Sequence, residues 1–119
     1  ILENTDYLNK ETQKKLAEVL EILRKVSEID VNVSHLTNKQ NEIDQRMHQT
    51  RQNLIALKHN KSAQDLKNKL SSSLAELAKE GEKVTRDIVA LTENRSVLAV
   101  SADQIIGEIT LEEEPKIAR

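Results

Sequence analysis

The amino-acid sequence predicts an all-α fold, an antiparallel coiled-coil helical hairpin formed by a single domain over residues 1–119. Three observations lead to this prediction. Apolar residues recur at alternating steps of three and four in each half of the chain, which is the spacing of a coiled-coil seam. The phase of this pattern breaks once, near Asn60, about halfway along the sequence. In addition, the amino-acid composition is unlike that of a compact globular protein or a β-sheet protein.

The composition supports long helices and argues against a large core. Of 119 residues, 37% are hydrophobic and 32% are charged, but Tyr7 is the only aromatic residue, whereas a large core normally uses Phe and Trp to fill its volume. Two Gly and one Pro are too few for the turns of a many-stranded sheet. A disordered chain would lack the sustained apolar period, so long helices are the remaining class.

We expect the first helix over about residues 6–58, with Asn4, Thr5 or Asp6 as its cap, since these side chains accept hydrogen bonds from free backbone N–H groups. Heptad position a of its seam is occupied by Val19, Val26, Val33, Met47 and Leu54. Position d is occupied by Ile22, Ile29, Leu36, Ile43 and Leu57. Four polar residues interrupt the same stripe: Thr12, Lys15, Gln40 and Thr50.

A turn is predicted at about residues 59–62. The apolar residues that follow, Ala63 and Leu66, are out of phase with the first seam. Asn60 is a residue type that tolerates the left-handed backbone conformation in which helices end. The segment from Ser62 to Asp65 resembles a capping box with Asp in place of the usual Glu, and it marks the start of the second helix.

The second helix is predicted over about residues 63–111, and Pro115 ends it at the latest. One row of its seam recurs every seven residues without a gap: Ala63, Leu70, Leu77, Val84, Leu91, Leu98 and Ile105. The other row consists of Leu74, Ile88, Ala102 and Ile109, and is interrupted by Lys67, Gly81 and Arg95. When the two seams fold back on each other, the numbers of contacting residues add to roughly 120, which places Gly81 near Gln40.

Gly81 is unusual in the interior of a predicted helix, where Gly costs ~1 kcal/mol relative to Ala. We interpret it as a place where the helix bends locally or where the two helices approach closely, because both seams are weak there. A functional hinge is the alternative interpretation.

The charge pattern excludes several classes of partner. The 18 basic and 20 acidic side chains are interspersed and give a net charge of −2, so we expect no nucleic-acid partner. No apolar run approaches the ~20 residues that span a bilayer, so we expect no membrane insertion of this chain.

The absence of Cys leaves the compartment unknown, with the cytoplasm slightly favoured. Because the chain begins at Ile1, we take it to be part of a longer protein.

The sequence contains no recognisable catalytic, cofactor-binding or metal-binding motif. His35, His48 and His59 fall on outward heptad positions, and none has another His three or four residues away, so they do not form a zinc site. Carboxylate pairs occur, but general acid–base chemistry needs a cleft that desolvates one member, which a slim hairpin lacks. We therefore expect neither an enzyme nor a bound cofactor or metal.

The sequence instead predicts a protein-interaction surface at the end of the hairpin away from the turn, where the apolar face is wider than a two-helix seam requires. The candidate residues are Leu16, Leu20, Leu23, Val89, Val97, Val100 and Ile106. They can pack against a second hairpin, giving a homodimer and a four-helix bundle, or against other helices of a larger assembly. The predicted function is a non-catalytic structural module that oligomerises or docks partner helices.

The sequence leaves two alternatives open. One is a sensory or signal-relay helical bundle of a membrane receptor, which would require transmembrane segments on both sides of this chain. The other is one continuous helix through Asn60 that pairs in parallel with another chain. The phase break and the capping residues argue against this continuous helix.

Overall fold

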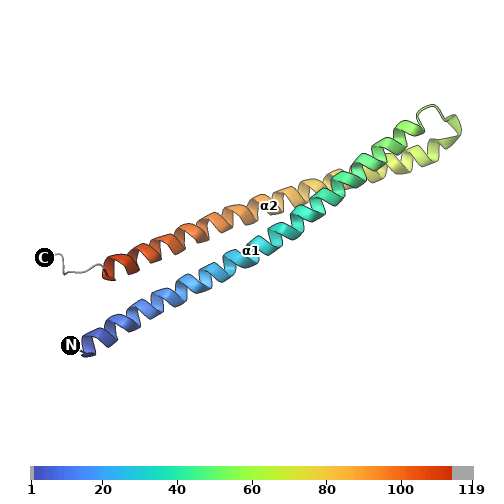
Figure 1. The fold of residues 1–119 in the computed structure, drawn as a ribbon. Coiled ribbons are helices and arrows are strands. Elements are labelled where there is room, and N and C mark those ends of the chain that lie inside the picture. The colour runs from blue at the N-terminus through green and yellow to red at the C-terminus, as the bar shows by residue number, and fades with distance from the viewer. Residues whose placement is uncertain (1, 114–119) are drawn as a thin grey trace. The chain divides into compact units, whose positions relative to one another are not determined.

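The fold consists of two long helices joined by a short turn. A computed structural model describes residues 2–113, with the side chains of residues 10–110. Helix α1 spans Leu2–Ala56, the 3-10 helix η1 spans Lys61–Ala63 and helix α2 spans Gln64–Glu113 (Figure 1). The described residues contain no strand, and the two helices pack against each other. This arrangement confirms the predicted all-α helical hairpin.

The chain divides into two compact units, each of which contains segments of both helices. Unit 1 combines Ile1–Val31 with Thr92–Arg119, and unit 2 is the continuous stretch Asn32–Leu91, which includes the turn. Within each unit the segment of α1 runs antiparallel to the segment of α2, because the chain reverses direction between the two helices.

The buried side chains follow the predicted seams. Between Thr12 and Leu57, every α1 side chain that is buried or half-buried lies at a predicted a or d position. The two predicted rows of α2 are also buried or half-buried, except for Arg95, which is exposed. The most deeply buried side chains are Val19, Val26, Ile29 and Ala102 in unit 1, and Ile43 and Val84 in unit 2. The alternating three and four spacing therefore identified the core of each unit.

The turn lies where it was predicted, but its capping chemistry differs. Asn60 has an extended backbone with φ −93° and ψ 100°, and no described residue has a positive φ, so the expected left-handed conformation is wrong. Asn60 instead caps η1, because its Oδ1 accepts hydrogen bonds from the backbone N–H of Ser62 at 3.1 Å and from the Ser62 hydroxyl at 2.7 Å. Ser62 lies inside η1 and is not the cap, since the better-placed Asn side chain already fills that role.

The outer ends of the helices also differ from the predicted bounds. Helix α1 begins at Leu2, so Asn4, Thr5 and Asp6 lie within the helix and the prediction that one of them caps it is wrong. It ends at Ala56, and α2 continues to Glu113, each two residues from the predicted limit of 58 or 111. Pro115 lies outside the described residues.

The pairing register agrees with the prediction to within a few residues. In unit 2, Gln40 donates a hydrogen bond to the Thr85 hydroxyl at 2.6 Å, so the contacting residue numbers add to slightly more than the expected value. Gly81 lines the same groove as Gln40, as predicted. A Cβ added to Gly81 would lie 3.5 Å from Cγ2 of Ile43, an ordinary van der Waals contact. A methyl group at this position would therefore fit between the helices without a clash.

Candidate interaction surface

The heptad register assigns the residues beside the seam to two flanks of each helix pair. In an antiparallel pair, the e positions of both helices line one flank and the g positions line the other. Unit 2 follows this rule. Lys39 and Glu80, both at g, form an ion pair at 3.4 Å, whereas Asp44, Ala78 and Thr85, all at e, line one groove together. The same register extends along both continuous helices and assigns the flanks of unit 1.

Unit 2 has polar flanks. Its e positions are Thr37, Asp44 and Arg51 on α1, and Ser71, Ala78 and Thr85 on α2. A seam that is apolar only at a and d, with polar neighbours, is the pattern of a two-stranded coiled coil. The exposed apolar side chains of unit 2 beside its seam, Ile55, Leu66 and Val89, therefore stand among polar e and g positions.

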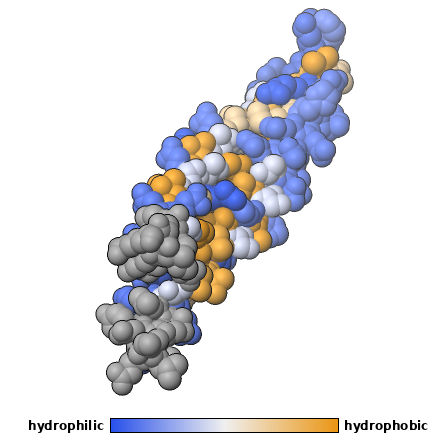
Figure 2. Space-filling view, turned by 60° about the vertical axis from the view of Figure 1, so that its left-hand side comes forward, coloured by the Kyte–Doolittle hydropathy of each residue, from blue (hydrophilic) through white to orange (hydrophobic). Residues whose placement is uncertain are grey.

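Unit 1 has one apolar flank. On that side, Asp30 and Thr92 are polar e positions. The apolar e positions are Leu16 and Leu23 from α1, and Ala99 and Ile106 from α2, with Leu20 beside them at position b. We call these five residues the apolar flank. Leu20 is 67% exposed, Leu16 and Leu23 are each 46% exposed, and Ile106 is 44% exposed. Figure 2 shows such exposed hydrophobic side chains as orange areas among blue ones in the lower part of the view.

The opposite flank of unit 1 is charged or polar. Its g positions are Glu11, Glu18 and Lys25 on α1, and Asn94, Ser101 and Glu108 on α2. On this side the Lys15 ammonium lies 3.9 Å from a carboxylate oxygen of Glu108. The excess of apolar surface in unit 1 is therefore directional, on the e side of the seam.

All seven side chains predicted to form an interaction surface are exposed. Four of them, Leu16, Leu20, Leu23 and Ile106, belong to the apolar flank. Val97 and Val100 are at c and f, on the side of α2 directed away from α1, and Val89 belongs to unit 2. The structure thus brings together only part of the predicted set.

Two residues near this surface were missed by sequence reasoning. Ala99 is half-buried at an e position, and heptad assignment would have found it, although a small side chain carries a weak hydropathy signal. Val31 is 53% exposed at position f and stands alone among polar neighbours, so no pattern singled it out.

The segment of α2 from Ser96 to Gly107 is apolar or uncharged on nearly every side. Asp103 is its only charged residue, whereas α1 in unit 1 carries charges on its outer face throughout. A helix that is hydrophobic on all sides is typically one that has neighbours on more than one side. Helix α1 covers one side of this segment, and the other sides are exposed at Val97, Val100 and Ile106.

Two groups of ion pairs in unit 1 are confined to the surface. Arg24 bonds to Glu21 and Glu28 on its own helix, and the hydrogen bond from Arg24, more than its charge, lowers the pKa of the Glu21 carboxyl. Arg95 donates hydrogen bonds to both carboxylate oxygens of Asp30, at 2.5 and 3.3 Å, and this contact raises the pKa of Arg95. All five side chains are exposed, so these pairs add little to stability.

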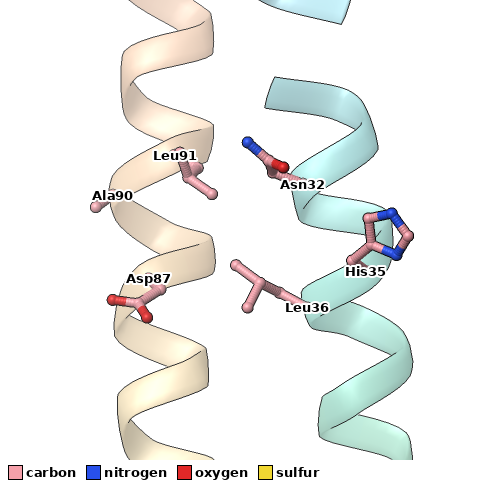
Figure 3. Close-up of a pocket in the computed structure, with 6 residues that line it drawn as sticks. All are labelled: Asn32, His35, Leu36, Asp87, Ala90 and Leu91. Atoms are coloured by element: carbon pink, nitrogen blue, oxygen red, sulfur yellow. The ribbon is translucent and has the colours of Figure 1, made fainter. Parts of the chain in front are cut away.

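Grooves run beside the seam of unit 2. One groove in unit 2, of about 420 Å³, is lined by Asn32, His35, Leu36, Asp87, Ala90 and Leu91. Figure 3 shows Leu36 and Leu91 pointing into the space between the helices, whereas the His35 ring and the Asp87 carboxylate do not converge. Within residues 10–110, no three His, Asp or Glu side chains are placed to hold one metal ion. The groove is a gap beside the seam.

Comparisons with protein-family models, with curated proteins and with solved structures gave no match. Across the described part of the chain, neither helix contains a segment with the length and hydrophobicity needed to cross a membrane.

Proposed function

We propose that this chain is a non-catalytic helical-hairpin module that packs against other helices through the apolar flank of unit 1. One observation supports the proposal: on the e side of the seam, unit 1 gathers the exposed side chains of Leu16, Leu20, Leu23 and Ile106, whereas most e positions of unit 2 are polar. Helices in bundles of more than two members use a, d and e positions, whereas a two-stranded coiled coil uses only a and d. Unit 1 thus has the pattern of a bundle member whose further neighbours lie on one flank.

The expected free energy of this packing is modest. Fully burying a Leu or Ile side chain contributes about 1.5–3 kcal/mol, so a half-exposed one contributes about 1 kcal/mol. The four large side chains of the flank together supply roughly 4 kcal/mol per hairpin before the entropy lost on association. Packing of this size is reversible when the partners are free, and it becomes strong when both belong to one assembly.

Cysteine labelling tests the proposal, because these 119 residues contain no Cys and a thiol introduced among them is the only one that they carry. Leu20→Cys places the thiol on the apolar flank, and Ile55→Cys places a matched thiol on an equally exposed α1 position of unit 2. We expect a maleimide to label Leu20→Cys several-fold more slowly than Ile55→Cys inside cells that produce the full-length protein. Equal labelling rates would show that nothing covers the flank and would contradict the proposed function.

A further inference from the structure

The charges of the chain are unevenly distributed, although they give a net charge of only −2. Residues 51–75 form the turn and the adjoining ends of both helices in unit 2 (Figure 1). Asp65 is the only acidic residue in this stretch, whereas five residues are basic: Arg51, Lys58, Lys61, Lys67 and Lys69. The turn end of unit 2 is therefore basic, and the excess of acidic residues lies elsewhere in the chain.

Four of these basic side chains are available to a partner. All four are exposed, and within residues 10–110 none of them forms an ion pair: Arg51, Lys58, Lys61 and Lys69. Lys67 is half-buried and donates a hydrogen bond to the Lys58 carbonyl at 3.4 Å, so it is held within the turn. We call the four exposed residues the basic tip.

We propose that the basic tip binds the phosphate backbone of a nucleic acid. This inference goes beyond the proposed function, because it concerns unit 2 and does not involve the apolar flank. It also departs from the expectation, based on the net charge of the whole chain, that no nucleic acid is a partner. A local cluster of cations attracts phosphates because charges beyond the Debye length, ~8 Å at physiological ionic strength, are largely screened.

Apart from Asp65, the nearest acidic residues along the two helices lie beyond this length. Asp44 on α1 and Glu76 on α2 are each seven residues from the nearest member of the basic tip on the same helix, which is ~10 Å at the helical rise. Asp65 lies in the first turn of α2, where free backbone N–H groups favour its negative charge. A phosphate at the turn therefore meets mainly the field of the basic tip.

The uncharged residues around the basic tip are also of the kinds that bind phosphate. Amide and hydroxyl side chains are interleaved with the cations and exposed: Gln52, Asn53, Asn60, Ser62, Gln64, Asn68, Ser71, Ser72 and Ser73. Such groups, together with Lys and Arg, contact phosphate oxygens in protein–DNA complexes. No aromatic residue lies within residues 51–75, so the basic tip lacks the platforms on which single-stranded bases stack. We therefore expect backbone contacts to a duplex, without sequence preference.

Two other anionic surfaces fit the basic tip less well. Peripheral attachment to a membrane combines basic residues with apolar side chains that enter the bilayer, whereas the turn from Lys58 to Ser62 contains no apolar residue. An acidic protein would have to gather four carboxylates within the ~20 Å that two helices side by side span. A DNA duplex places about six phosphates of each strand along the same length, one per ~3.4 Å. Its regular charge density matches the basic tip without any special arrangement.

Fluorescence anisotropy of the purified chain with a labelled DNA duplex of random sequence tests this inference. Four phosphate contacts predict that the logarithm of the association constant falls with the logarithm of the salt concentration with a slope of about −3.6. Raising the salt from ~50 to ~150 mM should thus weaken binding by about fiftyfold. Lys69→Gln alone should reduce the steepness of this slope by about 0.9, because one contact is lost.

Two fourfold variants separate the effect of the basic tip from that of the net charge. The tip variant replaces all four members by Gln: Arg51→Gln, Lys58→Gln, Lys61→Gln and Lys69→Gln. The control variant makes the same change of charge at exposed positions outside residues 51–75: Lys25→Gln, Lys79→Gln, Lys83→Gln and Arg86→Gln. At ~50 mM salt we expect the tip variant to bind at least about fiftyfold more weakly than the wild type, and the control variant to stay within about threefold. Circular dichroism verifies that both variants remain helical.

Several results would overturn the inference. These are a wild type that does not bind the duplex at ~50 mM salt, a slope close to zero, an unchanged slope for Lys69→Gln, and a control variant that loses as much affinity as the tip variant. The same holds if vesicles of equal parts phosphatidylserine and phosphatidylcholine, or polyglutamate, bind as tightly as the duplex at equal salt, since the partner would then be a membrane or an acidic protein. None of these results bears on the apolar flank, which the labelling experiment tests separately.

Discussion

Replacing Gly81 by Ala should stabilise the protein, although glycines inside helices are often retained for close packing. Helix α2 runs without interruption through Gly81, whose φ is not positive, so Ala fits the backbone. The added methyl group would lie 3.5 Å from Cγ2 of Ile43, at ordinary contact distance. Removing the conformational freedom of glycine contributes about 0.8–1 kcal/mol, and the partly buried methyl adds about 0.4 kcal/mol. Together these predict a gain of about 1–1.5 kcal/mol.

Gly107→Ala is the matched control, because a Cβ at Gly107 meets nothing within 4 Å and the substitution adds helix propensity alone. Urea unfolding followed by circular dichroism gives both free energies of unfolding, and we expect a larger gain for Gly81→Ala than for Gly107→Ala. In a thermal scan, the Gly81→Ala gain corresponds to an increase in Tm of about 5 °C. A loss of stability for Gly81→Ala alone would refute the packing described around Ile43. A variant that is more stable but no longer performs its function in the cell would instead support a hinge at this glycine.

Three further predictions concern the polar contacts between and along the helices. Gln40→Leu should raise the free energy of unfolding by about 1 kcal/mol, measured in urea, because a polar side chain at position a costs stability even when it is hydrogen-bonded. A double-mutant cycle with Asp30→Asn and Arg95→Met should give a coupling energy below about 1 kcal/mol, since both side chains are exposed; a larger value would indicate a desolvated pair. Because the pKa of Glu21 is lowered in the folded state, its carboxylate stabilises the protein at neutral pH, and this contribution disappears as the pH falls through that pKa. The Tm difference between wild type and Glu21→Gln should therefore be present at pH 7, vanish in acid and shrink in high salt, and a difference that persists in acid would contradict the assignment.

Much of the fold was predictable from the sequence because one physical pattern repeats throughout it. Fourteen heptad positions from Thr12 to Leu57 identified the inward face of α1, including polar residues such as Lys15 and Gln40 that hydropathy alone would place outside. A seam sustained over so many turns leaves few alternatives for pairing or for fold class. The position of the turn followed from the single break in phase near Asn60.

The helix ends and the role of Asn60 were less predictable, because several residue types compete for the same backbone groups. Asn60 and Ser62 can each accept a hydrogen bond from a free N–H group, and the sequence does not rank them. The backbone conformation decides the outcome: with Asn60 extended, its side chain accepts both the N–H and the hydroxyl of Ser62. At the other end, α1 begins at Leu2, so Asp6 lies inside the helix despite the preference of its residue type for helix ends.

The candidate surface shows what periodicity predicts and what it does not. The sequence identified exposed apolar residues in both halves of the chain. Which flank of the helix pair each of them occupies, however, depends on how the two helices pair. Once the e and g flanks are assigned, Val97 is separated from Leu20, although both are exposed to a similar extent. Exposure alone therefore does not define an interface, since side chains must also share a flank to be covered by one partner. Val97 and Val100, on the outer side of α2, would remain exposed if a partner covered the apolar flank, and they mark where a further neighbour would have to pack for the whole segment from Ser96 to Gly107 to be enclosed.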